Sequence, residues 1–239
     1  MKKLLFFFAV SLIAATSFAQ QINDPNAEMR EAKDFHAIRV SNAFDVYLSQ
    51  GNEEAVAVSA SDDEAKQYIK VSVDAGVLII SFDADKKFWK QWKGSKKLKA
   101  YVSFKTLDKL LVSGACDVNF VNGLKTENLV VHLSGASDLK GKLEVDNVLD
   151  VEMDGASDIE ISGSAAQLKA NLSGACDFKG YDLVTDYCDV KASGASGVKI
   201  TVNKELSASV SGASDINYKG SGMVRDLKSS GASSIKKRS

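Results

Sequence analysis

Proline, histidine and cysteine are scarce in this chain of 239 residues, which holds one proline, two histidines and three cysteines. The sole proline, Pro25, precedes the patterned part of the sequence, so every later strand keeps its full set of backbone N–H donors. Charge of one sign is also missing, because 30 basic and 31 acidic residues leave a formal net charge of −1. This balance argues against a nucleic-acid binder that uses its whole surface.

Long hydrophobic runs are missing after residue 19, so the mature chain has no predicted transmembrane segment. The run that is present, Leu4 to Ala15, follows Lys2 and Lys3 and precedes the small residues of Ser17-Phe18-Ala19. That order predicts a secretory signal peptide over residues 1–19, with an uncleaved anchor as the alternative. We therefore expect export to the periplasm or the cell surface, with residues 20–34 as a flexible lead.

Seven copies of the motif Gly-Ala-(Ser/Cys)-(Asp/Gly/Ser) occupy the second half of the chain. The glycines are spaced by 21, 20, 19, 20, 18 and 19 residues. A fixed period near 20 is typical of a solenoid with one coil per repeat. The motif glycines are Gly114, Gly135, Gly155, Gly174, Gly194, Gly212 and Gly231.

Apolar residues alternate with polar ones before each glycine, which indicates strands with one buried face. After the glycine, a small alanine is expected to face inward at the corner, and serine and aspartate to bond nearby main chain. Most copies have a second turn, so each coil is expected to hold two or three short strands. The position four residues before the glycine holds Leu110, Val131, Val151, Ala170, Val190, Ala208 and Leu227.

These patterns predict an all-β fold, a right-handed parallel β-helix with coils of about 20 residues. The β-helix domain is expected over residues 35–239, with regular coils at 109–235 and irregular coils plus a cap at 35–108. Strands are expected at 44–48, 56–59, 69–73, 77–82 and 98–104, and one helical turn at 62–67. A separate N-terminal β-domain is the alternative.

The three cysteines, Cys116, Cys176 and Cys188, are predicted to be free. Cys116 and Cys176 share a repeat position three coils apart, which separates them by about 14 Å in stacked strands. A disulfide needs Cα atoms within about 7 Å.

The sequence resembles the autotransporter-adhesin family with a head GIN domain, found in exported proteins of Bacteroidetes-type bacteria. The resemblance rests on the opening stretch from Ile38 to Gly51, on Val77-Leu78-Ile79-Ile80, and on the Ser-Gly-Ala-Ser-Asp copies. It covers about residues 35 to 235. It implies a right-handed β-helix, an exported location and an adhesin-like role, and it brings no catalytic residues.

A ladder of aspartates forms the first candidate site. In stacked coils these carboxylates repel one another, and Ca²⁺ would relieve the repulsion. A turn residue bonding its own bend is the simpler interpretation, and lysines two positions later offset the charge. We therefore expect no cofactor and retain Ca²⁺ as the alternative. The candidate ligands are Asp117, Asp138, Asp158, Asp177 and Asp215.

The second candidate site is the segment 86–99, which holds both tryptophans and seven lysines. Aromatic rings beside lysines suit a glycan, an anionic polysaccharide or a membrane interface. The alternative is a loop whose aromatic rings pack on the solenoid. The candidate binding residues are Phe88, Trp89, Lys90, Trp92 and Lys93.

The function predicted from these features is that of an exported, non-enzymatic β-helix protein with an adhesin-like binding or structural role in the cell envelope. Its expected partner is a glycan or another envelope component. The alternative is a polysaccharide lyase or hydrolase on the same scaffold. Near-identical repeats disfavour an enzyme, which needs one site that differs from the rest.

Overall fold

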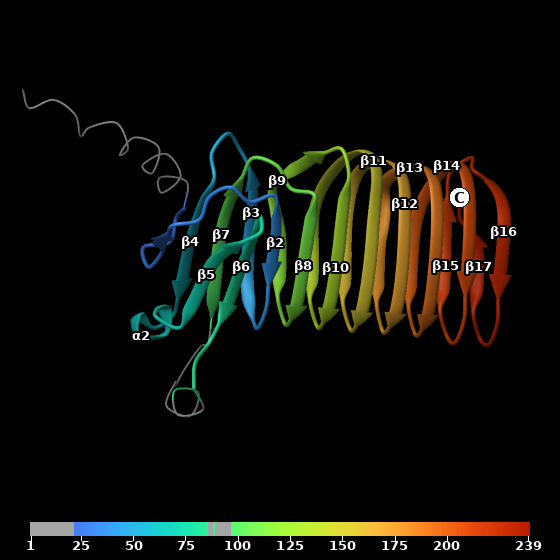
Figure 1. Cartoon of the computed structure of the whole chain (residues 1–239). Helices are drawn as coiled ribbons and strands as arrows, with labels where there is room; N and C mark the ends of the chain where they lie inside the picture. The colour runs from blue at the N-terminus through green and yellow to red at the C-terminus, as the bar shows by residue number, and fades with distance from the viewer. Residues whose placement is uncertain (1–21, 86–87, 89–96) are drawn as a thin grey trace, which may run out of the picture.

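The computed structural model describes residues 22–85, 88 and 97–239, and it is an all-β solenoid of about six turns with about 20 residues per turn (Figure 1). In the described part of the chain, no helix has the length and apolarity needed to cross a membrane. The elements are β1 (Glu28–Arg30), β2 (Ala37–Val40), β3 (Phe44–Gln50), β4 (Ala55–Ala60), α2 (Asp63–Lys66), β5 (Ile69–Asp74), β6 (Val77–Phe82), β7 (Leu98–Phe104), β8 (Lys109–Gly114), β9 (Asp117–Thr126), β10 (Leu129–Gly135), β11 (Asp138–Gly155), β12 (Asp158–Gly174), β13 (Asp177–Gly194), β14 (Gly197–Val210), β15 (Asp215–Lys219), β16 (Met223–Ser229) and β17 (Ser234–Lys237).

The repeat coils stack in parallel with like residues above like residues, as the period predicts. Val131 pairs with Leu110 on one side and with Val151 on the other, and Ala170 continues the same ladder to Val190. All five side chains are at most 3% exposed. The alternating apolar positions therefore fill the interior of the solenoid, and the predicted inward ladder is confirmed.

The Gly-Ala-Ser corner is built differently from the expectation. The alanine faces solvent, as Ala156 does, and the serine or cysteine after it turns inward, where Ser157 is fully buried. The Ser157 hydroxyl donates to the Asp154 carbonyl at 3.1 Å, which satisfies it inside the corner. The inward alanine was wrong, because the buried position holds a side chain that can donate to a backbone carbonyl at the bend, and an alanine has no donor.

The second glycine of a coil marks an irregularity in the pairing, not the end of a strand. β11, β12 and β13 run for 18, 17 and 18 residues without a break. The register between β11 and β9 shifts between Gly141 and Leu143, and the register between β12 and β13 shifts between Glu160 and Gly163. Such bulges bend a strand while its neighbours stay paired.

The N-terminal half adds its coils out of sequence order. The five predicted strands are present as β3 to β7, and the predicted helical turn is present as α2. β2 and β3 pair in parallel directly with β8 and β9, while β6 and β7 stack on the far side of β2 and β3. The chain therefore first forms the coil of β2 and β3, which stacks on the repeats. It then forms the outer coil with β6 and β7, and returns to the repeats at β8.

The three cysteines are free and buried, as predicted. Burial raises the pKa of all three thiols, and for Cys188 it does so to about 11 despite contact with the Thr185 hydroxyl. A thiol that stays neutral and covered does not react.

We expect a thiol reagent such as DTNB at pH 8 to modify the folded chain about a hundredfold more slowly than the chain in guanidinium, since reaction requires opening of the fold. The absorbance of the released dye measures both rates. Rapid modification of a folded chain would contradict the buried placement of the cysteines.

Candidate binding surfaces

Four of the five predicted aspartates form one continuous row, at the strand positions that directly follow the corners. Asp117 pairs with Asp138, Asp138 with Asp158, and Asp158 with Asp177. Gly197 then interrupts the row before Asp215. The structure adds a member at the other end, because Asp45 of β3 pairs with Asp117. Sequence reasoning missed Asp45 because no Gly-Ala-Ser corner precedes it, although the same aspartate-apolar step is there in Asp45-Val46.

Repulsion within the aspartate row is visible at its middle. The pKa of Asp138 is raised by partial burial and by the neighbouring carboxylates Asp117 and Asp158. Lys179 offsets part of this charge, with its ammonium 3.1 Å from the Asp158 carboxylate. The row does not converge: among the described residues, no group of three or more His, Cys, Asp or Glu is placed to hold a metal ion. The aspartate row is thus a line of separate carboxylates, each beside a corner of its own coil.

A second outward row lies two residues further along each strand and contains the lysines that follow the aspartates in sequence. Lys140 and Lys179 flank Glu160 in register, and Lys199 follows Lys179. A shallow pocket of about 500 Å³ lies over these side chains and Tyr181. This face therefore presents opposite charges side by side, not a field of one sign.

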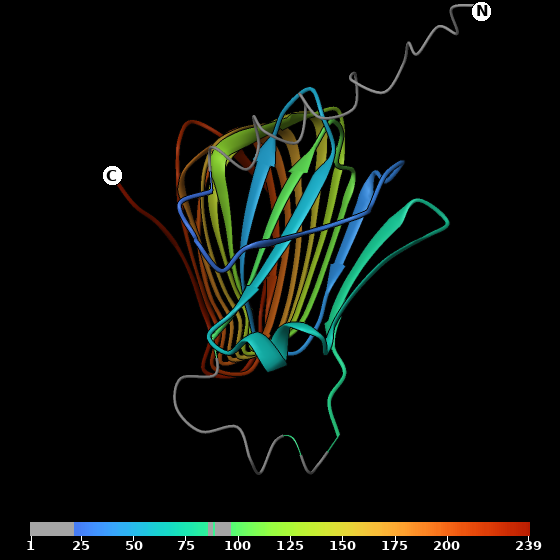
Figure 2. The same ribbon diagram turned by 90° about the vertical axis from the view of Figure 1, so that its left-hand side faces the viewer.

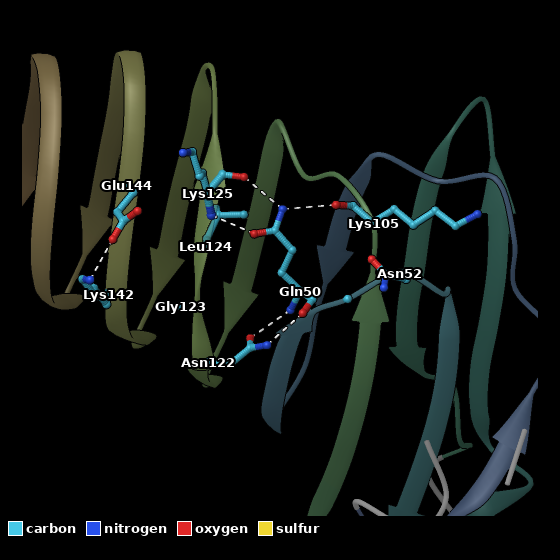
Figure 3. Close-up of a pocket in the computed structure, with 10 residues that line it drawn as sticks. Gln50, Asn52, Lys105, Asn122, Gly123, Leu124, Lys125, Lys142 and Glu144 are labelled. Atoms are coloured by element: carbon cyan, nitrogen blue, oxygen red, sulfur yellow. Dashed lines mark hydrogen bonds and ion pairs between the residues drawn. The ribbon is translucent and has the colours of Figure 1, made fainter. Parts of the chain in front are cut away.

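A third surface lies at the turn edge of the first coils, around a clasp between Gln50 and Asn122 (Figure 3). The Asn122 side chain accepts from the Gln50 backbone N–H at 3.0 Å and donates to the Gln50 carbonyl at 2.8 Å. The Gln50 amide donates to the carbonyls of Lys105 and Lys125 and accepts from the Lys125 N–H. These bonds join three neighbouring coil segments and fix the backbone beneath a pocket of about 400 Å³.

Three lysines surround this clasp, and we call Lys105, Lys125 and Lys142 the basic rim. Lys142 is paired with Glu144 at 2.7 Å, which lowers the pKa of that carboxyl. Lys105 and Lys125 form no ion pair within the described ranges. In Figure 3 the Lys105 and Lys125 side chains extend in opposite directions from the clasp. The rim spreads positive charge along the solenoid and does not concentrate it at one point.

Of the tryptophan segment, residues 86–99, the structure describes Phe88 and residues 97–99. Phe88 is 5% exposed, and its ring packs against Tyr68 and Phe82 with centroids 4.4 and 6.0 Å away. This burial removes Phe88 from the candidate binding residues, because a ring inside the core offers no face to a ligand. Trp89, Lys90, Trp92 and Lys93 lie outside the described residues.

Comparison with known proteins gives the chain a family. Residues 34–222 match the model of the family described as "putative auto-transporter adhesin, head GIN domain". The chain belongs to this family. The match spans the aspartate row, the basic rim and the tryptophan segment, and it ends just before β16. No curated protein shows significant sequence similarity to the chain.

Solved structures similar to this adhesin-family chain share its fold. A crystal structure described as a putative adhesin from Bacteroides fragilis is 24% identical, covers 89% of this chain and 96% of its own, and has a TM-score of 0.82. One described as a putative lipid binding protein from Parabacteroides distasonis is 19% identical over 90% and 98% of the two chains, with a TM-score of 0.68. Another, described as a putative adhesin from Parabacteroides merdae, is 18% identical over 89% and 95%, with a TM-score of 0.62.

Proposed function

We propose that this chain is an exported, adhesin-like binding protein without enzymatic activity, which holds an extended anionic glycan or similar anionic polymer of the cell envelope. The observation that carries the proposal is the basic rim. A small anion calls for donors that converge on it, and those of Lys105 and Lys125 diverge. A polymer with repeated charges meets separated ammonium groups one after another.

The rest of the molecule supports a binding role. The family description and the adhesin descriptions of similar structures point to attachment. Residues 1–19 carry the pattern of a signal peptide, which supports export. The aspartate row repeats one side chain from coil to coil, whereas catalysis by carboxylates depends on two groups in different environments.

The tryptophan segment is proposed as a second contact on sequence grounds. Trp89 and Trp92 supply aromatic faces for sugar rings, and Lys90 and Lys93 supply charge next to them. With the basic rim, this gives two separable sources of affinity: stacking, which depends weakly on salt, and charge attraction, which screening weakens.

We expect the double substitution Lys105→Glu with Lys125→Glu to weaken binding of dextran sulfate by about tenfold or more, because each reversal replaces attraction with repulsion. Biolayer interferometry on immobilised dextran sulfate measures the affinity. The matched control is Lys169→Glu with Lys191→Glu, two exposed lysines on β12 and β13 that give the same change in net charge.

Equal losses in the two double variants would show attraction by net charge alone and would contradict the assignment to the basic rim. A third variant, Trp89→Ala with Trp92→Ala, separates the two proposed contacts. If it alone abolishes binding while its melting temperature is unchanged, the tryptophan segment is the site and the rim is not.

A further inference from the structure

The C-terminal end of the solenoid is an open sheet edge. β16 pairs with β14 and β17 pairs with β15, and in the described chain no strand pairs with the outer edge of either one. Every residue of β16 is exposed. Both strands lie at the end marked C in Figure 1, and both fall beyond the family match, which ends at residue 222. Unpaired N–H and C=O groups on such an edge are a template for another strand.

Apolar side chains accompany this open edge. Leu227 stands over Ala208 in the inward ladder, but it is 44% exposed where Ala208 is 2% exposed. Val224, in register with the buried Leu206, is 42% exposed, and Met223, in register with the outward Glu205, is 75% exposed. The terminal coil therefore exposes to solvent the inward side chains that, in each earlier coil, are covered by the next coil.

The opposite end of the solenoid is covered. β4 crosses that end and pairs antiparallel with β7 and β1, and Val56 through Ala60 are all at most 3% exposed. Figure 2 looks onto this end, with the cyan segments of β4 and α2 in front of the coils. In the described chain β1 and β5 each keep one unpaired edge at that end, but the inward side chains there are covered. The exposed interior of the C-terminal end therefore finds no matching exposed interior in head-to-tail stacking. Two open ends match each other, and the resulting two-fold contact closes as a dimer instead of growing into a filament.

We propose that the open edge binds a second copy of this chain, with β16 of the two copies paired antiparallel about Leu227. In this register Leu227 lies opposite Leu227 of the second copy, which covers both inward side chains. Asp226 then lies opposite Lys228 of the second copy, and Lys228 opposite its Asp226. Asp226 and Lys228 both occupy outward positions, in register with Ser207 and Ser209.

The reciprocal charges favour a second copy over an unlike partner. A two-fold contact requires a strand that is complementary to itself. Asp226 and Lys228 meet that requirement because they have opposite charge and flank Leu227 symmetrically; in the single chain they lie 3.0 Å apart. Arg225 pairs with Glu205 of its own chain at 2.9 Å, and in this register it lies opposite the uncharged Ser229 of the second copy.

Two single substitutions and their mixture test the proposal on the full chain. Asp226→Lys places lysine opposite lysine in a homodimer, and Lys228→Asp places aspartate opposite aspartate. Each single variant is expected to self-associate about tenfold more weakly than the wild type, since like charges directly opposite are unfavourable. An equimolar mixture restores opposite charges at both contacts and is expected to form a heterodimer.

Sedimentation velocity across a concentration series measures the association, and circular dichroism melts verify that both variants fold. Dimers in the wild type and in the mixture, with weakened association in each single variant, would support the proposal. A wild type that stays monomeric at high concentration would overturn it and leave the edge to another partner. Dimers that persist in both single variants would also overturn it, because the contact would then lie elsewhere.

Discussion

Gly155→Val is expected to destabilise the solenoid by about 3 kcal/mol or more. Gly155 has a φ of 80°, which a β-branched residue adopts only under strain. A Cβ at this position would also overlap the carbonyl oxygen of Gly135 in the coil beneath. That carbonyl accepts the Ala156 N–H at 2.7 Å, so moving it away breaks the bond between two coils.

The matched control is Asp158→Ala, three residues later on the outside of the same corner. Asp158 makes a partly exposed ion pair with Lys179, and such pairs contribute about 1 kcal/mol or less. Loss of a repelled member of the aspartate row offsets part of that cost. Urea unfolding of both variants measures the difference, and equal losses would contradict the role given to the glycine corner.

Leu110→Ala is expected to lower the free energy of unfolding by about 2–5 kcal/mol, whereas Leu227→Ala should lower it by less than about 1 kcal/mol. The two leucines occupy the same inward ladder, one at the start of the repeats and one in the last coil. Leu110 is fully buried and Leu227 is 44% exposed. Removing the buried side chain leaves a cavity between two coils, while removing the exposed one leaves none.

Chemical denaturation at low protein concentration compares the two leucine variants without the contribution of self-association. A large loss for Leu227→Ala under these conditions would mean that its side chain is covered within the single chain. The account of the open end would then be wrong, whatever the outcome for Leu110→Ala.

The repeat architecture was predictable from sequence because it depends on local, repeated signals. Alternation before the glycine placed Val131 and Val151 in one ladder, and the period placed the coils one above another. The orientation of the corner was not predictable in the same way. Alanine and serine are both small, and the hydrogen bond that the inward hydroxyl of Ser157 donates to the Asp154 carbonyl is visible only in the folded corner.

The surfaces were less predictable because they combine residues that are distant in sequence. The clasp joins Gln50 to Asn122, which are 72 residues apart, and no motif connects them. Asp45 extends the aspartate row only because β3 stacks directly on β9, although the outer coil separates the two strands in sequence. The spacing of the repeats predicted the aspartates within them, but it could not predict that β3 stacks on β9.

The most direct test of the proposed function compares wild-type binding to dextran sulfate with binding to unmodified dextran, two polymers that share a backbone and differ in charge. The account predicts binding to dextran sulfate that weakens as salt is raised, and binding to dextran that is weaker by about tenfold or more, because only the stacking contact can hold an uncharged polymer. Attraction through the basic rim depends on charge, and screening shortens to about 8 Å at physiological ionic strength. Equal affinity for the two polymers, or an affinity for dextran sulfate that salt leaves unchanged, would contradict it.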